Sequence, residues 1–537
     1  MFYNEDIKNI FCMEKGGIIM NQKHVNWLTF LPPAIALGCI IAVGALVPKA
    51  LDNSMAALLD WVNHNCDWFY CLGMFLLMVF CLWAAFGKCG KIRLGGKDAK
   101  PEMSFWKWFC VVLTSGMAVG ITYWCVAEPL SYFQTPPGYA GYEGGTIEAA
   151  EGALRYVLLH WTLIPFACFT AGAVVIAFLY WNCKKPFSIS TGFYPLIGEK
   201  ALGGSRYLVN ALCIFCLCCG LGTTLGLAVD QMSVGLQYTM GLNISKDVLA
   251  FIVCVGFAAI GILVACSGLH KGVTYVSTAN MYLFLFFLGF TLLFGGNLHT
   301  ILGSIITSTG KYLGFLIPEA LNTEPYTQSG WVANQTVFYW GWWVAFGPMV
   351  GLFQVKLAKG RTVREYILVN MIVPGIFLTI WMCTFGSTAI SYTLAGNTSI
   401  TDAIASWGSS VAFFAFLKNL PLSVILIPVA LITMIFSIVT QTEAEILTVA
   451  DMCVATDEEL AKSDNMAPAW IKVIWGLIMS FMAYILLYSG GLAAVQNISI
   501  IIGVLMLLIL LVTCAGGIKA FRNYKEYDVT LEEDEDY

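Results

Sequence analysis

The chain has 537 residues, of which 58% are hydrophobic and only 11% are charged. Soluble globular proteins carry about a quarter charged residues, so this composition excludes a soluble core and places most of the chain among lipid or other apolar helices. The net charge of −5 shows no sign of a nucleic-acid partner. The 19 cysteines are scattered through apolar runs without the spacing of a metal site, and we interpret them as small buried hydrophobic residues.

A membrane-spanning helix needs about 20 mostly apolar residues, and the sequence contains about twelve such runs. They lie at 27–48, 67–87, 106–133, 153–181, 206–237, 247–266, 272–297, 334–357, 363–386, 421–444, 469–489 and 492–518. The first run is long enough to span, so we expect a membrane helix there and no cleaved signal peptide. Two amphipathic stretches are too polar to span and are expected in the interface or packed outside the bundle, at 300–318 and 399–417. The predicted fold class is therefore an all-α polytopic membrane protein.

Lysine and arginine predict the orientation of these spans, because cytoplasmic loops carry an excess of both. Basic residues gather in four segments that a twelve-span chain places on one side: 88–107, 182–206, 356–364 and 519–525. The segment 134–152 falls on the opposite side and carries three glutamates but no lysine or arginine. We therefore expect a multi-pass protein of the cell membrane with both termini in the cytoplasm. The acidic tail at 526–537 is expected to be solvated.

Two of the runs contain helix breakers at similar places. The third includes TSGMAVGITYWCVAEP (114–129), with Gly116 and Gly120 in mid-span, and the eighth includes WGWWVAFGPMVG (340–351), with Gly347 and Pro348 in mid-span. Glycine permits unwinding, and proline removes a helix donor. Interrupted helices in corresponding positions of two halves are typical of secondary transporters built from inverted repeats, which bind ions and solutes near the midplane. The alternative is that both residue types are simply frequent in membrane helices.

Aromatic residues crowd the run before Gly347. They are Tyr339, Trp340, Trp342, Trp343 and Phe346, and neighbouring runs add Tyr123, Trp124, Trp161, Phe166 and Phe169. A quaternary ammonium group cannot donate a strong hydrogen bond and is held by aromatic faces, each worth roughly 0.5–2 kcal/mol when desolvated. The pattern therefore indicates an aromatic box for such a cation. The competing interpretation is a belt of interfacial rings, although Tyr123 and Trp161 lie inside their runs.

Four carboxylates lie within or at the ends of apolar runs and are functional candidates on that ground. They are Glu128, Asp230, Glu443 and Glu445. Structural anchoring is an equal alternative for Glu128 and Asp230. Glu443 and Glu445 could instead lie at the cytoplasmic end of their helix, next to water.

Several of these segments resemble the betaine/carnitine/choline transporter family. YWGWWVAFGPMVGLFQVKLAKGRTVREYI (339–367) is similar to the signature of that family, GMAVGITYWCVAEPLSYF (116–133) to its third span, HWTLIPFACFTAGAVVIAFLY (160–180) to its fourth, and SGLHKGVTYVSTANMYL (267–283) to the start of its seventh. The resemblance extends from about residue 27 to residue 520. It implies a LeuT-like core of two inverted five-helix repeats behind two extra helices, and a homotrimer.

The family pattern divides the chain into six parts. They are a cytoplasmic N-terminus (1–26), two extra spans and a loop (27–105), the first repeat (106–297), an external amphipathic segment (298–333), the second repeat (334–520) and an acidic cytoplasmic tail (521–537). The implied function is uptake of a small quaternary-ammonium solute by alternating access. The short acidic tail predicts no strong osmotic activation, because osmosensing members use a long basic one.

The resemblance implies a substrate site of nine residues in this chain: Trp161, Phe166, Phe169, Trp342, Trp343, Tyr123, Phe346, Gly116 and Gly120. Three depart from the family. The family often has Trp at Phe166 and Tyr at Phe169, and its glycine-betaine carriers have Trp at Phe346. Choline carriers tend to place an acid at Gly120, so its absence here is an argument against choline. The solute therefore stays open among glycine betaine, carnitine, γ-butyrobetaine, choline and related methylamines.

Sodium is the expected coupling ion, and no other cofactor is expected. Family positions for Na⁺ correspond to Thr114, Met117, Thr440 and Gln441, with a second site near Thr223 and Thr224. Gln441 replaces a usual serine. Sodium-independent carnitine exchangers carry an arginine in the seventh span, whereas the matching position here is the neutral Asn280, so we expect Na⁺ coupling over exchange.

Three alternatives remain at this point. The first is sodium-independent exchange of carnitine-type betaines. The second is a carrier of another LeuT-like family, such as an amino-acid transporter. The third is a membrane-embedded enzyme, for which the chain offers only five histidines and no HExxH or GxSxG motif. We expect a transporter and not an enzyme.

Overall fold

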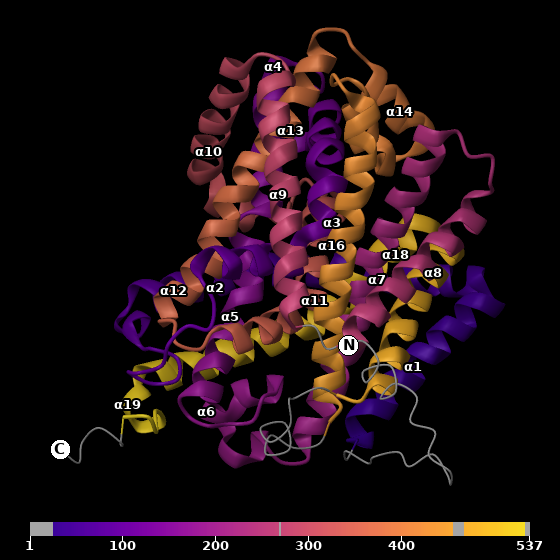
Figure 1. The fold of residues 1–537 in the computed structure, drawn as a ribbon. Helices are drawn as coiled ribbons and strands as arrows, with labels where there is room; N and C mark the ends of the chain where they lie inside the picture. Colours follow the sequence, from indigo (N-terminus) through magenta and orange to yellow (C-terminus); the bar gives the residue numbers. More distant parts are fainter. Residues whose placement is uncertain (1–24, 268–269, 455–466, 532–537) are drawn as a thin grey trace, which may run out of the picture.

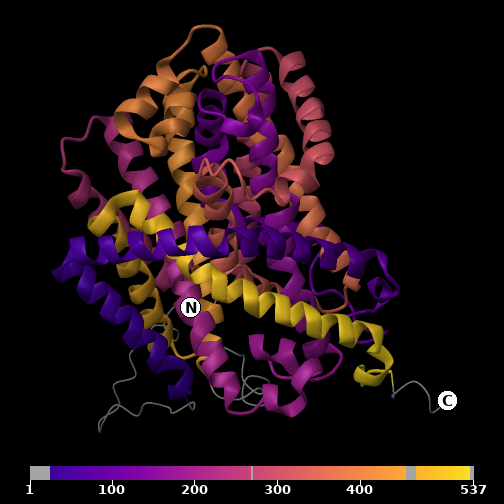
Figure 2. The ribbon, with the colours of Figure 1, turned by 180° about the vertical axis from the view of Figure 1, so that it is seen from behind.

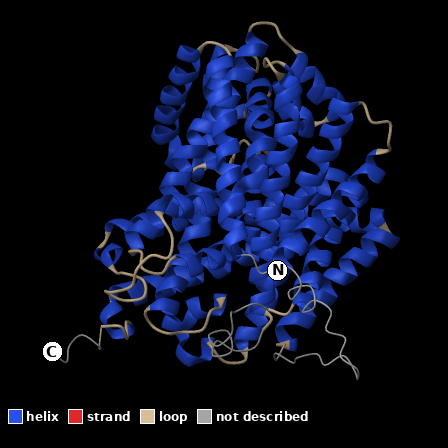
Figure 3. Ribbon diagram, viewed as in Figure 1, coloured by secondary structure: helices blue, strands red, loops and turns tan. Residues whose placement is uncertain are grey.

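A computed structural model describes residues 25–267, 270–454 and 467–531. These residues are almost entirely helical (Figure 3), and their only strand-like pairings are two isolated bridges, Val25 to Val454 and Arg93 to Thr362. The all-α prediction is confirmed. Eleven of the described helices are long and apolar enough to cross a membrane, and a twelfth is obtained when the two parts of α3 are counted as one span.

The longer helices occupy most of the bundle in Figure 1. They are α1 (Trp27–Leu46), α2 (Pro48–Phe86), α3 (Phe105–Gln134), α4 (Ile147–Trp161), α5 (Leu163–Trp181), α7 (Ser205–Met240), α8 (Lys246–Cys266), α9 (His270–Phe294), α10 (Leu298–Ala320), α11 (Val337–Leu357), α13 (Val373–Leu394), α16 (Ser423–Met452) and α18 (Ala469–Arg522). Short helices connect them: α6 (Tyr194–Ile197), α12 (Val363–Ile367), α14 (Ser399–Trp407), α15 (Ala412–Lys418) and α19 (Tyr524–Tyr527).

Two long helices cross the back of the bundle, α2 and the second part of α18 (Figure 2), and they pack against each other. The first of them starts at Pro48 and is much longer than the predicted run at 67–87. The second begins after Gly490 and Gly491, whose non-helical backbone divides α18. Gly491 has φ +64°, which only glycine adopts at little cost, so the predicted boundary between 469–489 and 492–518 is confirmed.

We predicted that 300–318 is too polar to span and lies in the interface or packs outside the bundle, whereas length and hydropathy place α10 among the candidate spans. It lies at the outside of the bundle against α4 and α13 (Figure 1). The central helix α11 is not among those candidates, because indole and phenol rings and glycine count as weakly polar on a hydropathy scale. Nearly all of its side chains are nevertheless buried within the protein. The rings of α11 are therefore packed against other helices, which an interfacial belt would not require.

The predicted interruption of the third span is confirmed, and that of the eighth is wrong. In α3, the parts Phe105–Gly116 and Val119–Gln134 meet at 65°. In contrast, α11 stays helical through Gly347 and Pro348. Gly347 serves packing instead, because a Cβ there would lie 2.8 Å from Cδ1 of Phe169 in α5. The difference between the bent α3 and the continuous α11 does not test the predicted pair of inverted repeats, which stays a prediction.

The basic segments gather at one end of the molecule, as predicted. Arg93 of the first donates from Nη1 to the carbonyl of Gly360 in the third (2.7 Å), and Asn182 of the second donates to the carbonyl of Arg93 (3.0 Å). The start of the acidic tail joins them, since Asn182 also donates to Asp528 (2.9 Å). Asp528 is 5% exposed, so the prediction of a solvated tail is wrong at this residue, whereas Glu526, Val529 and Leu531 are exposed, and 532–537 lie outside the described residues.

Candidate functional site

Aromatic side chains from α4, α5 and α11 meet in the centre of the bundle. The ring centroids of Trp161 and Trp343 are 5.0 Å apart at 78°, and those of Trp342 and Trp343 are 4.4 Å apart and stacked. Phe169 lies 6.2 Å from Trp343 and 5.6 Å from Phe346. All five side chains are at most 1% exposed. Five of the nine predicted substrate residues therefore form one continuous cluster, which we call the aromatic cluster.

The other two predicted rings lie at the margins of the aromatic cluster. Phe166 reaches it through Phe169, at 5.9 Å. Tyr123 contacts Trp124 at 4.8 Å, and Trp124 in turn contacts Tyr339 at 5.8 Å. The hydroxyl of Tyr123 is buried and has no hydrogen-bond partner among the described residues. Tyr123 therefore adds an uncommitted polar group beside the cluster.

Both predicted glycines let α3 approach the cluster closely. A Cβ on Gly120 would lie 2.6 Å from Cη2 of Trp161 and 3.2 Å from Cη2 of Trp342. A Cβ on Gly116 would lie 3.2 Å from Cε2 of Phe169. Real Cβ atoms essentially never approach another heavy atom closer than 3.0 Å. Gly120 therefore holds the bend of α3 against two indoles, and a larger residue there would displace them.

A break between α4 and α5 sets the position of Trp161. Pro165 has no N–H, and its ring conflicts with the carbonyl four residues earlier, which belongs to Trp161. The helix accordingly ends at Trp161, and Thr162 has the non-helical angles φ −112° and ψ −110°. The break leaves the His160 carbonyl free of its helix partner, and the indole N–H of Trp343 donates to it at 2.9 Å. The indole of Trp343 in α11 is thus hydrogen-bonded to the backbone at the break that positions Trp161.

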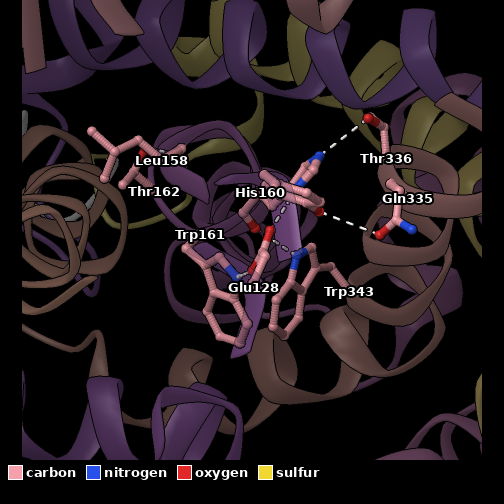
Figure 4. Close-up of polar contacts among 9 residues, drawn as sticks. Glu128, Leu158, His160, Trp161, Thr162, Gln335, Thr336 and Trp343 are labelled. Carbon is pink, nitrogen blue, oxygen red and sulfur yellow. Dashed lines mark hydrogen bonds and ion pairs between the residues drawn. The ribbon is translucent and has the colours of Figure 1, made fainter. Parts of the chain in front are cut away.

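A buried polar network fixes the same two indoles (Figure 4). Glu128 of α3 accepts from Nε1 of Trp161 at 2.5 Å, and its other oxygen lies 2.8 Å from Nδ1 of His160. The far nitrogen of His160 lies 3.1 Å from the hydroxyl of Thr336. Glu128 and His160 are at most 1% exposed. This network joins α3, α4 and the segment before α11, which supports the anchoring interpretation of Glu128.

Two members of this site were not in the predicted set. His160 stacks on Tyr339 at 4.6 Å, and Tyr339 lies 5.7 Å from Trp161. The sequence signal for His160 is its place directly before Trp161 and five residues before a proline in a buried helix. Tyr339 belongs to the aromatic run before Gly347, yet only the fold reveals that it faces the network.

The indole of Trp342 is bonded to α7, where two threonines had been considered for an ion. Its Nε1 donates to the hydroxyl of Thr224 at 3.1 Å. The neighbouring Thr223 faces away toward α18 and lies 2.7 Å from the hydroxyl of Ser499. The structure therefore brings Thr224 to the aromatic cluster and separates Thr223 from it.

The remaining predicted ion residues lie on α3 and α16, which pack together. The hydroxyl of Thr114 donates to the carbonyl of Cys110 and that of Thr440 to the carbonyl of Phe436, both at 2.8 Å, so their lone pairs stay available. Gln441 donates from Nε2 to Glu445 at 3.2 Å. For Met117, at the bend of α3, the side chain lies outside the described part.

The other carboxylates differ in their surroundings. Asp230 is 4% exposed and forms an ion pair with Lys246 at 2.9 Å, which ties α7 to α8 and supports anchoring. Glu443 and Glu445 are both buried within α16, at 3% and 2% exposure. The alternative that they lie next to water is therefore wrong.

In this conformation, the rings of the cluster contact one another, so they present a packed wall of π-faces. Such a wall attracts a methylated cation that enters it, because ring faces carry negative charge density. A polar anion or a hydrogen-bonding sugar would lack partners there. The arrangement therefore suits a quaternary-ammonium group, and it requires the rings to separate before that group can be enclosed.

Comparisons with known proteins agree with this geometry. Residues 28–526 match the model of the betaine/carnitine/choline family transporters. The chain is 31% identical over 503 residues to a glycine betaine transporter of Acinetobacter baylyi, covering 93% of this chain and 74% of the relative. It is 30% identical over 505 residues to a probable glycine betaine transporter of Desulfitobacterium hafniense, covering 94% and 98%. An osmo-dependent choline transporter of Acinetobacter baylyi is 29% identical over 514 residues, covering 95% and 74%.

The fold and the site define a polytopic helical membrane transporter. This chain belongs to the betaine/carnitine/choline transporter family. The family assignment excludes the alternatives of an enzyme and of a carrier from another LeuT-like family.

Proposed function

We propose that this protein imports a small quaternary-ammonium solute across the cell membrane by alternating access, coupled to Na⁺. One observation carries the proposal: Trp161, Trp342, Trp343 and Phe169 are fully buried together beside the bend of α3. A cation that cannot donate hydrogen bonds is bound by the faces of buried aromatic rings, and these four rings provide such faces.

A zwitterionic betaine fits the surroundings of the cluster. Its ammonium group would lie against Trp161 and Trp343, and its carboxylate would face the backbone at the bend of α3 between Gly116 and Gly120. The names of two relatives specify glycine betaine and that of another specifies choline, which supports the solute class. We place glycine betaine and related zwitterions before choline, because Gly120 provides no acid for the choline hydroxyl.

The closed packing of the rings supports alternating access. The rings must part to admit a solute and meet again around it, so the packed cluster is the resting state between two openings. Sodium is the proposed cargo ion, and the buried hydroxyls of Thr114 and Thr440 supply lone pairs of the kind that Na⁺ prefers. The alternative is exchange without sodium, which the neutral Asn280 disfavours because no fixed cation replaces the ion.

Replacement of Trp343 by leucine tests the proposal. A desolvated cation–π contact contributes up to about 2 kcal/mol, which corresponds to a factor of about 30 in affinity. We expect Trp343→Leu to raise the KM for glycine betaine uptake into proteoliposomes about ten- to thirtyfold, with normal membrane insertion. Trp407→Leu is the matched control, because Trp407 is 43% exposed on α14. An unchanged KM in Trp343→Leu would remove the aromatic cluster from solute binding.

The coupling ion is tested in the same proteoliposomes. Uptake of glycine betaine is compared under an inward Na⁺ gradient, an equal K⁺ gradient and with solute preloaded inside. Equal rates with Na⁺ and K⁺, together with stimulation by internal solute, would replace the symport proposal by exchange.

A further inference from the structure

The last turns of α11 and α16 are joined by an ion pair at the end of the molecule that carries the basic segments. Nζ of Lys356 in α11 lies 2.5 Å from Oδ2 of Asp451 in α16, and the side chain of Asp451 is only 6% exposed. The other oxygen of Asp451 accepts from the backbone N–H of Ala467 at 3.4 Å. Nζ of Lys356 also lies 4.8 Å from the ring centroid of Phe187, in the segment after α5. The pair thus connects the two helices where the segment after α5 and the residues before α18 also meet them.

The N-terminal segment holds the end of α16 directly after this pair. Val25 forms an antiparallel bridge with Val454, and the backbone N–H of Asn26 donates to the carbonyl of Cys453 at 2.9 Å. Because this bond joins two backbones, it fixes the position of the chain two residues after Asp451 whatever rotamers the side chains adopt. The N-terminal segment is therefore tied to the turn that carries the carboxylate.

Aromatic side chains extend this contact to α18. The ring of Trp27 stacks on that of Trp470 at 6.4 Å, and the ring of Phe30 lies 5.8 Å from Trp470 and 5.5 Å from Trp475. Phe30 and Trp475 are at most 5% exposed, so these contacts bury apolar surface. We call residues 25–30 the strap, because they cross from the end of α16 to the start of α18.

The start of α18 is in turn anchored to α8. Nζ of Lys472 donates to the carbonyl of Ala265 at 3.0 Å, and the thiol of Cys266 contacts the carbonyl of Ala469 at 3.8 Å. The helix that follows the strap, α1, packs against α7 and α18 (Figure 1). The strap therefore attaches the end of α16 to helices that are already bonded to one another. By contrast, α11 reaches Asp451 through one flexible side chain.

The ion pair lies beyond the aromatic cluster on the predicted cytoplasmic side. Lys356 follows Phe346 by ten residues, which is about 15 Å along α11 at 1.5 Å per residue. Because α11 carries three rings of the cluster, a movement that parts them from the rings of α4 and α5 displaces α11. In the proposed alternating access, release of the solute toward this end requires the helices around the cluster to separate there. Displacement of α11 from α16 at this end breaks the pair.

We propose that the pair of Lys356 and Asp451 closes the solute path at the cytoplasmic end, and that the strap holds Asp451 in place, so that the N-terminal segment controls opening toward the cytoplasm. The inference rests on the proposed alternating access and adds to it a regulatory role for the strap. A strap with a purely structural role would stabilise the ends of α16 and α18 without changing how often α11 separates from α16. The two roles therefore differ in their effect on α11.

Hydrogen–deuterium exchange of the purified protein measures this separation without transport. Backbone amides at the end of α11 (350–357) exchange when that end opens, and their exchange rate follows the population of the open state. A half-exposed ion pair shifts an equilibrium by up to about fivefold, so we expect Asp451→Asn to raise exchange at 350–357 about two- to fivefold. Lys356→Met breaks the same pair from its 40% exposed side and should give the same increase, which keeps the test valid if Asp451→Asn does not fold.

Phe30→Ala tests the strap from a position that contacts α18. We expect it to raise exchange at 350–357 at least about twofold, because the loosened strap no longer holds Asp451 for its partner. Leu28→Ala is the matched control, since Leu28 lies in the strap but is 66% exposed, and its exchange at 350–357 should equal that of the unmodified protein. The double variant Lys356→Asp with Asp451→Lys reverses the pair and should return exchange toward the unmodified value.

Two results would overturn the inference. One is an increase in Phe30→Ala confined to 451–454 and 469–475, which would show local loosening alone. The other is unchanged exchange at 350–357 in both variants of the ion pair. Glycine betaine is added to the same samples to separate this inference from the proposed function. If the solute slows exchange around the aromatic cluster while the variants behave as the unmodified protein, the strap fails and solute transport stands. If the solute has no effect and is not taken up, the proposed function fails.

Discussion

The carboxylate of Glu128 offers a sharp test of how the aromatic cluster is held. Its two oxygens bond to Trp161 and to His160 at 2.5 and 2.8 Å, inside a site from which water is excluded. In Glu128→Gln, the remaining oxygen can still accept from Trp161, and the new NH₂ group can donate to Nδ1 of His160 in the tautomer that carries its proton on Nε2, so both bonds become neutral. Hydrogen bonds to charged groups contribute about 1.5–3 kcal/mol and neutral ones about 0.5–1.5 kcal/mol, so a weakening of about 1–1.5 kcal/mol at Trp161 corresponds to a loss of about 5- to 15-fold in solute affinity.

The assay is the Kd for glycine betaine, measured by tryptophan fluorescence on purified protein, together with KM and kcat of uptake and the unfolding temperature. Glu128 does not contact the solute in our proposal but orients Trp161, so we expect Kd and KM to rise together while kcat changes little. Glu128→Asp should recover part of the affinity, because it keeps the charge. Glu151→Gln is the matched control: Glu151 is paired with Lys311 at the surface, where such pairs contribute about 0–1 kcal/mol. A lower unfolding temperature with an unchanged Kd would refute positioning and leave only a structural role.

Two further predictions concern atoms that touch the cluster. Gly120→Ala should weaken glycine betaine binding at least about tenfold, because the added Cβ would lie 2.6 Å from Trp161. Gly116→Ala should have a milder effect, because the nearest contact of its Cβ would be 3.2 Å away. Equal Kd values for the two variants would contradict the packing argument. Trp342→Phe keeps a ring but deletes the N–H donated to Thr224, so we expect a loss of about 1 kcal/mol, or about fivefold in Kd. In a double-mutant cycle with Thr224→Val, the two effects should be strongly non-additive, and simple additivity would show that this bond does not orient the ring.

The sequence was informative where one residue type decides the local structure. Gly116 and Gly120 predicted a bend in α3, and the bend is present. Hydropathy and the basic loops led to the all-α fold and to the end at which the charged segments meet. The ring content of 337–353 indicated which helix would form the centre.

The same reasoning was insufficient where tertiary contacts decide. Pro348 suggested a broken helix, but α11 is continuous through it. Pro165 was not predicted to break a helix, yet α4 ends at Trp161, four residues before it. The helices that carry the two prolines pack in different surroundings, and a single sequence does not contain that packing. The partners of Glu128 were likewise beyond reach, since they come from different helices. Asp528 looked solvated because only the fold brings Asn182 to it.

The hydrogen bonds of the three indoles have a consequence for selectivity. Trp161, Trp342 and Trp343 each direct their N–H to a protein oxygen, on Glu128, Thr224 and the backbone of His160 respectively. Both oxygens of Glu128 are also engaged. A solute among these three indoles therefore meets carbon and π-electrons, and the uncommitted side-chain acceptor described beside the cluster is the hydroxyl of Tyr123. A primary ammonium group has three N–H donors, more than this hydroxyl can accept, and each unsatisfied donor costs about 1–3 kcal/mol, whereas a trimethylammonium group has none. The aromatic cluster therefore distinguishes solutes by the methylation of their ammonium group more than by their charge.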